Sequence, residues 1–268
     1  MKGSGLLDKA AAVARRDLLT AIRYRTGFLF TALGTGAELA AFYYLAKALG
    51  PSFRPEGFEY FPFVLVGTGF YSFLISGSSQ FLSTVQSAQQ TGTLEVLVTT
   101  ATPAPVLLFL SAMSAFSGPT LQLFFYLGAG LLWFASALHP NLAGCVVVFL
   151  LSLIVAIAVG LIAAALQLAI QKGSAVVWLL GSTSWLMTGA LFPISTLPKP
   201  FWWAGQLIPL THSLNAMRRA LFEGAGFRAL GNEIGILVLF CAVLLPASLV
   251  AFSFALRRAR MAGTLSFY

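Results

Sequence analysis

The chain has 268 residues, of which 58% are hydrophobic and only 9% are charged, and its formal net charge is +8. Soluble domains usually carry about 25% charged residues, so this chain has too little polar surface to cover a fold that faces water on all sides. The composition therefore argues against a soluble protein, and the basic charge does not by itself indicate nucleic acid. It predicts a protein whose solvent is a lipid bilayer.

Six apolar runs are long enough to be membrane-spanning helices, which need about 20 mostly apolar residues. They lie at 26–49, 61–85, 105–134, 142–170, 175–192 and 233–256. Backbone groups in lipid must be hydrogen-bonded within the protein, and the short alternating segments of a β-barrel are absent, so the runs predict helices. We expect an all-α polytopic membrane protein with a single domain over 1–268. It comprises a six-span bundle over 26–256 and a basic tail over 257–268.

The segment 1–25 is predicted to be an amphipathic helix that lies in the membrane interface. Apolar residues recur at helical spacing from Leu7 to Ile22, while Lys9 and other bases lie elsewhere around the turn. A solvated basic tail is the alternative. The side chains that we expect to meet anionic headgroups are Arg15, Arg16, Arg23 and Arg25.

The basic residues near both ends of the bundle predict an orientation. Lys and Arg collect on the cytoplasmic side of membrane proteins, so both termini are expected in the cytoplasm. Four bases between the fifth and sixth runs break this rule, namely Lys199, Arg218, Arg219 and Arg228. Their segment, 193–232, is rich in proline and contains Trp202 and Trp203. It is predicted to form two short helices that dip into the outer leaflet, and a surface loop with aromatic anchors is the alternative.

The connection between the second and third runs is predicted to carry a short amphipathic helix on the cytoplasmic side. Thr91 is placed to cap its start, and Glu95 lies near its first turn, where a negative charge suits the helix dipole. Leu94, Leu97 and Val98 give it an apolar face, which needs a groove on a partner to be buried. The alternative is an interfacial helix that rests on its own bundle.

Polar residues inside the runs are candidates for a translocation path. Glu38 lies near the middle of the first run, where an ionised side chain is costly unless it faces protein or water. The second run carries further candidates, and tight packing between helices is the alternative for all of them. These are Ser76, Ser79, Gln80 and Ser83.

Other sites are not expected. Cys145 and Cys241 lie in apolar runs and are predicted to be unpaired core residues. The two histidines, His139 and His212, have no further ligands at zinc spacing. We therefore predict no metal site and no catalytic residue.

Several short motifs resemble the ABC-2-type transporter permeases, the membrane subunits of ABC exporters. They are Ala14-Arg15-Arg16-Asp17-Leu18, Gly92-Thr93-Leu94-Glu95 with Thr102-Pro103, Phe192-Pro193, Leu197-Pro198, Pro209-Leu210-Thr211 and Arg218. The resemblance implies that two copies, commonly identical, form one channel. It also implies that each copy rests a coupling helix in a cleft of a cytosolic ATPase subunit. The residues at that contact would be Gln89, Gln90, Gly92, Thr93, Leu94, Glu95, Leu97 and Val98.

The chain contains no Gly-x-x-x-x-Gly-Lys-Ser/Thr loop for phosphate binding. We therefore expect no cofactor and no enzyme activity in this chain, with ATP and Mg²⁺ bound by the partner. The resemblance implies a bacterial inner-membrane exporter of an amphipathic or lipid-like small molecule or drug. Export of a glycolipid or polysaccharide is an alternative within the family. A membrane-embedded lipid-modifying enzyme and a self-sufficient carrier are alternatives from other classes.

Overall fold

The computed structural model describes residues 25–91, 104–134 and 140–262. All regular elements of these residues are helical, in agreement with the expected all-α class. The long helices are α2 (Arg25–Leu49), α3 (Tyr60–Gln90), α5 (Ala104–Phe134), α6 (Leu142–Ile170), α7 (Gly173–Met187) and α10 (Phe227–Ala262). The short ones are α8 (Lys199–Gln206), α9 (Pro209–Phe222) and the 3-10 turns η1 (Pro55–Gly57) and η3 (Ile194–Thr196).

The helices follow the six predicted apolar runs closely at most of their ends. Of the described helices, α3, α6 and α10 are long and apolar enough over their windows to cross a membrane. The fifth predicted run is wrong at its end, because α7 stops at Met187 rather than at residue 192. There Thr188 donates a hydrogen bond to the Ser184 carbonyl at 2.6 Å, and Gly189 at φ +80° turns the chain. The six-span topology as a whole stays a prediction.

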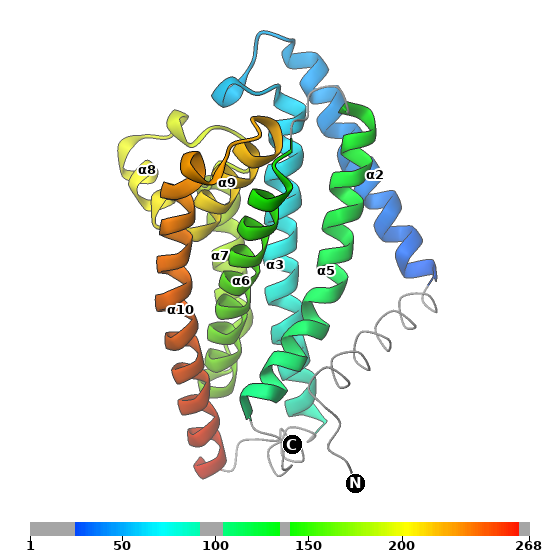
Figure 1. The fold of residues 1–268 in the computed structure, drawn as a ribbon. Coiled ribbons are helices and arrows are strands. Elements are labelled where there is room, and N and C mark those ends of the chain that lie inside the picture. The colour runs from blue at the N-terminus through cyan, green and yellow to red at the C-terminus, as the bar shows by residue number, and fades with distance from the viewer. Residues whose placement is uncertain (1–24, 92–103, 135–139, 263–268) are drawn as a thin grey trace.

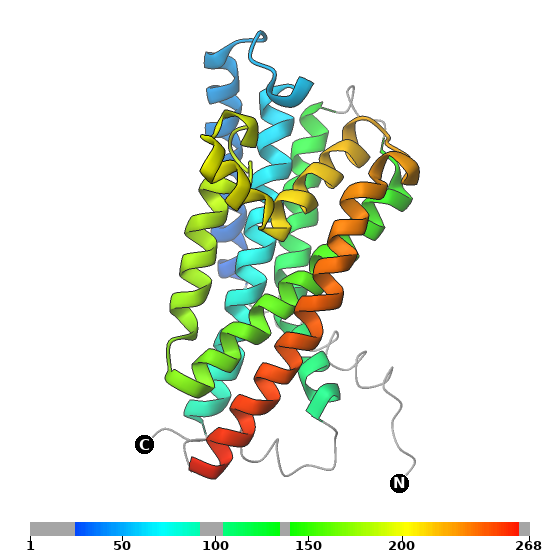
Figure 2. The same ribbon diagram turned by 90° about the vertical axis from the view of Figure 1, so that its left-hand side faces the viewer.

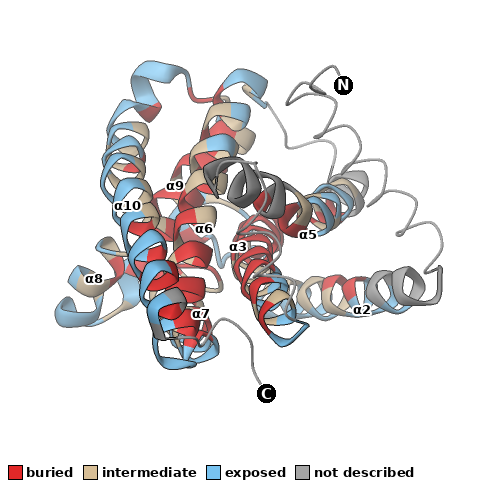
Figure 3. Cartoon of the chain, turned by 90° about the horizontal axis from the view of Figure 1, so that it is seen from below, coloured by how far each residue is buried: buried red, intermediate tan, exposed pale blue. Residues whose placement is uncertain are grey.

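Helix α3 is the central element of the bundle. It packs against α2, α5, α6, α7 and α9, and Figure 3 shows its buried surface facing inward between them. Buried aromatic residues such as Phe63, Phe70, Phe73 and Phe81 fill these contacts. On α6, Gly160 and neighbouring alanines let helices approach closely, as small residues do in membrane bundles.

Helix α10 covers the other side of α6. The two helices pack along each other, and α9 lies against both of them. In Figures 1 and 2, α10 ends at the lower end of the bundle, while α8 and α9 lie towards the opposite end. Helix α3 ends at that lower end too, whereas α2 begins about halfway up the bundle (Figure 1). The segment between α7 and α10 contains two short helices, α8 and α9, as predicted. Their depth in a membrane stays a prediction.

Two smaller expectations can be compared with the structure. Thr91 was expected to begin a short helix, but it ends α3: its backbone lies in the α region and its hydroxyl donates to the Ser87 carbonyl at 2.8 Å. That expectation is wrong because the second helical run continues past residue 85. Cys145 and Cys241 are both free thiols, as expected.

Candidate transport groove

One face of α3 is not covered by the described part of the chain, and that face is polar. Ser72, Ser76 and Ser79 are half-buried on it, while Gln80 and Ser83 are exposed. The uncovered face of α10 is very different, since its large exposed residues include Val238, Leu239, Val243, Val250 and Phe254. An apolar face suits lipid, whereas polar side chains at membrane depth need water or a protein partner. The two faces therefore have different surroundings.

Helix α7 forms the second wall beside this polar face. A hollow of about 790 Å³ lies between α3 and α7. Tyr71, Trp178 and Trp185 give it aromatic surface, and the rings of Tyr71 and Trp185 meet edge to face at 4.6 Å. Ser79, Gln86 and Ser182 supply hydroxyl and amide groups. We call this hollow the α3–α7 groove.

The α3–α7 groove adjoins a second hollow at the far end of α7. This space of about 440 Å³ is lined by Leu197, Phe201 and other mostly apolar side chains near α8. Ser182 and Leu186 line both hollows. The two hollows therefore follow α7 from Ser174, beside its first residue, to the short helices at the other end of the bundle.

The sequence-predicted path residues divide into two groups. Ser79 lines the α3–α7 groove, and Ser76, Gln80 and Ser83 lie on the same uncovered face of α3. Glu38 is not among the residues that line the groove. It lies with Ser72, Gln122 and Tyr126 around a small gap between α2, α3 and α5. Glu38 is thus half-buried among polar groups at the opposite edge of the α3 face.

Hydroxyl groups elsewhere on α3 serve packing rather than the groove. Ser78 is buried and donates to the Ala156 carbonyl of α6 at 3.2 Å. Thr68 is buried as well, and its hydroxyl lies 2.7 Å from the Tyr126 hydroxyl of α5. Tight packing therefore explains some of the polar residues of this helix, but not those on its uncovered face.

Arg218 of α9 joins the start of α3 to the turn that follows α7. Its side chain is 1% exposed, and its guanidinium donates to the carbonyls of Phe63 at 3.0 Å and Gly189 at 2.8 Å. The guanidinium carbon also lies 3.5 Å from the centre of the Phe63 ring, within the range of a cation–π contact. Because this charge is buried inside the bundle, Arg218 is not a loop charge, and one of the four exceptions to the orientation rule disappears.

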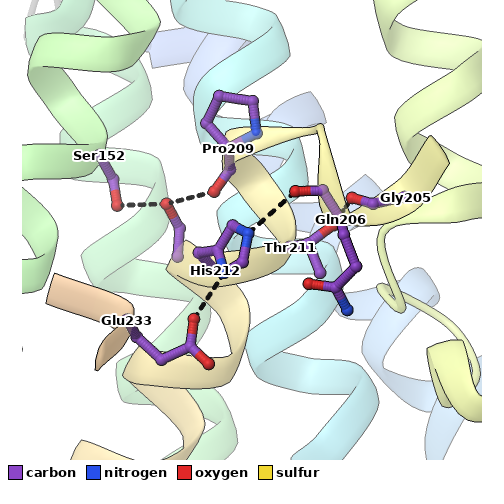
Figure 4. Close-up of polar contacts among 8 residues, drawn as sticks. Ser152, Gly205, Gln206, Pro209, Thr211, His212 and Glu233 are labelled. Atoms are coloured by element: carbon purple, nitrogen blue, oxygen red, sulfur yellow. Dashed lines mark hydrogen bonds and ion pairs between the residues drawn. The ribbon is translucent and has the colours of Figure 1, made fainter. Parts of the chain in front are cut away.

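A second polar cluster joins α9 to α10 and α6. His212 Nδ1 lies 2.6 Å from Glu233 Oε2, and His212 Nε2 lies 3.0 Å from the Gln206 carbonyl oxygen (Figure 4). A carbonyl can only accept, so Nε2 carries a proton. Nδ1 and the carboxylate then also need one proton between them. In the same view Ser152 of α6 donates to the Ser213 hydroxyl at 2.8 Å.

The protonation of His212 reflects opposing effects. Burial lowers the pKa of the imidazole, but the hydrogen bonds to Glu233 and to the Gln206 carbonyl, together with the charge of Glu233, outweigh it and raise the pKa above its ordinary value. The charged form of His212 is therefore favoured in the folded protein, and the pair fastens the short helices to the start of α10.

Neither polar cluster was found from the sequence. From the sequence, Arg218 is a base between the fifth and sixth runs and one of the family motifs, and His212 is a histidine without further ligands at zinc spacing. The useful signal was the ionisable character of residues in segments that are otherwise apolar, because such residues need partners at membrane depth. Among the described residues no group of three or more metal-ligating side chains comes together.

Most residues of the predicted ATPase contact and of the predicted interfacial helix lie outside the described residues. Gln89 and Gln90 form the last turn of α3, and the side chain of Gln89 is buried. The remaining contact residues, within 92–98, are not described. Arg25 is the first residue of α2, and Arg15, Arg16 and Arg23 precede the described part.

The helical bundle with apolar outer helices is that of a polytopic membrane protein, and its polar, aromatic-walled α3–α7 groove is a candidate path for a solute. Comparison with known protein families identifies the family of the chain. The family model described as ABC-2 family transporter protein matches residues 39–250, which is well over half of the sequence. The chain belongs to this family of ABC transporter membrane proteins. No curated protein matches the sequence significantly.

Proposed function

We propose that this protein is the permease subunit of an ATP-driven ABC exporter in the bacterial inner membrane. Two copies would face each other across their α3–α7 grooves and enclose one path. A separate cytosolic subunit would bind ATP and Mg²⁺ and hydrolyse the nucleotide. Family membership supports the permease role, and the missing phosphate-binding loop supports the separate ATPase.

The observation that carries this proposal is the uncovered polar face of α3. Ser76, Ser79, Gln80 and Ser83 would be unfavourable against lipid tails, because hydrocarbon offers them no hydrogen bonds. A second copy that encloses water between the two grooves would satisfy these groups. The same arrangement would leave the apolar face of α10 towards lipid, where its valine and leucine side chains fit.

The groove favours an amphipathic or lipid-like cargo. Among the described residues, its lining contains no lysine, arginine, histidine or carboxylate, so these residues supply no fixed charge for a polyanionic chain. Trp178 and Trp185 offer broad apolar faces, and Ser79, Gln86 and Ser182 offer a few directional hydrogen bonds. Binding sites for amphipathic small molecules combine these two features.

The orientation proposed for the exporter places the lower end of the bundle in Figure 1 in the cytosol. The ends of α3 and α10 and the start of α5 all lie at this end. Arg257 and Arg258, near the end of α10, are exposed there. Residues 89–98 would join the ATPase from this side, because they comprise the last two residues of α3 and the segment directly after it.

The proposal can be tested by purifying the tagged full-length chain from membranes of a bacterial host that expresses the natural operon. We expect an ABC ATPase subunit to copurify, and ATP hydrolysis by the complex to fall when Leu94 and Leu97 are both changed to aspartate. A matched change of two lipid-facing residues, Val243 and Val250, would control for general damage to insertion. Full ATPase copurification and activity with both aspartates present would contradict the proposed contact.

A further inference from the structure

A separate hollow lies where α2 ends and α3 begins, far from the α3–α7 groove along the sequence of α3. Its volume is about 320 Å³, and residues from the last turns of α2, the connecting turn and the first turn of α3 line it. Figure 1 shows the α2–α3 connection at the same end of the bundle as α8 and α9. Because helix ends in a spanning bundle reach the membrane surface, this hollow lies at headgroup depth.

Two opposite charges face this hollow. Lys47 lies in the last turn of α2, and Glu59 immediately precedes α3. Among the described residues neither side chain has an ion-pair or hydrogen-bond partner. Both are exposed to solvent, so both can meet a charged ligand at little desolvation cost.

Four aromatic rings line the same hollow as the two charges. Tyr43 and Phe61 meet edge to face with their centres 5.9 Å apart, and Phe53 and Tyr60 meet with centres 5.5 Å apart. All four rings line the hollow. Aromatic faces attract ammonium groups through their quadrupole, and tyrosine hydroxyls add hydrogen-bonding capacity at the membrane interface.

The two opposite charges and the aromatic rings of this hollow together favour one kind of ligand. Lys47 suits a phosphate, whereas Glu59 and the ring faces suit an ammonium group. A purely anionic headgroup would meet repulsion from Glu59, and a purely cationic one would meet repulsion from Lys47. A headgroup with a phosphate and a primary ammonium a few bonds apart avoids both penalties.

We propose that this hollow binds the zwitterionic headgroup of a phosphatidylethanolamine molecule from the surrounding bilayer. The phosphate lies towards Lys47, and the ammonium lies between Glu59 and the aromatic walls. The lipid holds the end of α2 against the start of α3. The inference needs only a membrane around the bundle, so it stands apart from the proposed coupling to ATP.

The test is a lipid titration of the purified full-length chain in mild detergent, with bound lipid counted by native mass spectrometry. The two probes are dioleoyl phosphatidylethanolamine and dioleoyl phosphatidylglycerol. We expect Glu59→Gln to weaken binding of the ethanolamine lipid roughly three- to tenfold and to leave the glycerol lipid unchanged or tighter. Lys47→Gln should weaken both lipids, because both carry the phosphate.

Two variants with the same charge changes serve as controls. Lys199→Gln and Glu223→Gln remove exposed charges that do not line the hollow. Neither should alter the titration of either lipid. If Glu59→Gln weakens both lipids equally, or neither, the proposed ammonium site is wrong. Variants that change the oligomeric state in size-exclusion light scattering, with lipid binding intact, would show that a second copy fills the hollow and would likewise overturn the proposal.

Discussion

Two glycines that differ in the space around them give the sharpest test of the packing. Gly67 of α3 lies against the turn that follows α7, at the Arg218 cluster. A methyl group at Gly67 would overlap the Ala190 carbonyl oxygen and lie 2.7 Å from Arg218 Nη2. A methyl group at Gly181 of α7 would instead meet its nearest atoms, on Ile75 and Tyr71, at 3.5 Å, which is ordinary contact.

Alanine at Gly67 should lower the stability of the protein, whereas alanine at Gly181 should leave it unchanged or raise it. Overpacking costs about 1–3 kcal/mol, and a weakened charge-assisted hydrogen bond of Arg218 adds about 1.5–3 kcal/mol, while alanine in place of glycine returns about 1 kcal/mol of helix propensity. Gly67→Ala should therefore destabilise the protein by about 1.5–5 kcal/mol, which corresponds to a melting temperature lowered by roughly 3–20 °C. Gly181→Ala should melt at the wild-type temperature or a few degrees above it.

Thermal unfolding of the two variants in detergent, followed by tryptophan fluorescence, measures this difference directly. Both variants add one methyl group to a buried glycine of a long helix, so each is the control for the other. Equal melting temperatures for the two variants would refute the packing described around Arg218.

Three further predictions concern the groove and its polar neighbours. Glu38→Gln should impair transport by the purified complex and leave assembly intact, and unchanged transport would remove Glu38 from the path. Gly181→Phe places a ring beside Tyr71 in the groove and should abolish transport of a bulky cargo, while the yield and melting temperature stay close to those of Gly181→Ala. The pKa of His212 is raised in the folded protein, so protonated His212 contributes its full stabilisation of the fold only below the unfolded pKa of about 6.5. This stabilisation is lost as the pH rises through the folded pKa, so the wild-type melting temperature should fall over that range. Glu233→Gln should flatten that dependence above about pH 6.5, and an unchanged pH profile would show that the pair does not share a proton.

The sequence predicts the long helices well because their signal is local. A run such as 142–170 is apolar throughout, begins directly after Asn141, which caps its first turn, and stops before the polar residue Gln171, so the local sequence marks both of its ends. The end of α7 depends instead on a turn at Gly189 and on the Arg218 contacts to the following carbonyls, which join residues far apart in sequence. Such long-range contacts leave no pattern in the run itself.

The candidate groove was predictable only in part for a similar reason. Helical spacing places Ser76, Ser79 and Ser83 on one face of α3, but it does not show which face the bundle covers. Only the packing of α5 and α6 against α3 reveals that Ser78 is buried and Ser79 is not. The aromatic wall from α7 comes from a part of the chain about 100 residues away, and nothing in the spacing of Trp178 and Trp185 connects them to α3.

The central claim is that the uncovered face of α3 borders water, whereas the uncovered face of α10 borders lipid. Single cysteines at Ser79, Ser83 and Val243, in a chain whose own Cys145 and Cys241 are changed to alanine, can be treated in proteoliposomes with a membrane-impermeant thiosulfonate. We expect the two α3 positions to react at least ten times faster than position 243. Equal, slow reaction at all three positions, in the presence and absence of the ATPase subunit and ATP, would contradict the account.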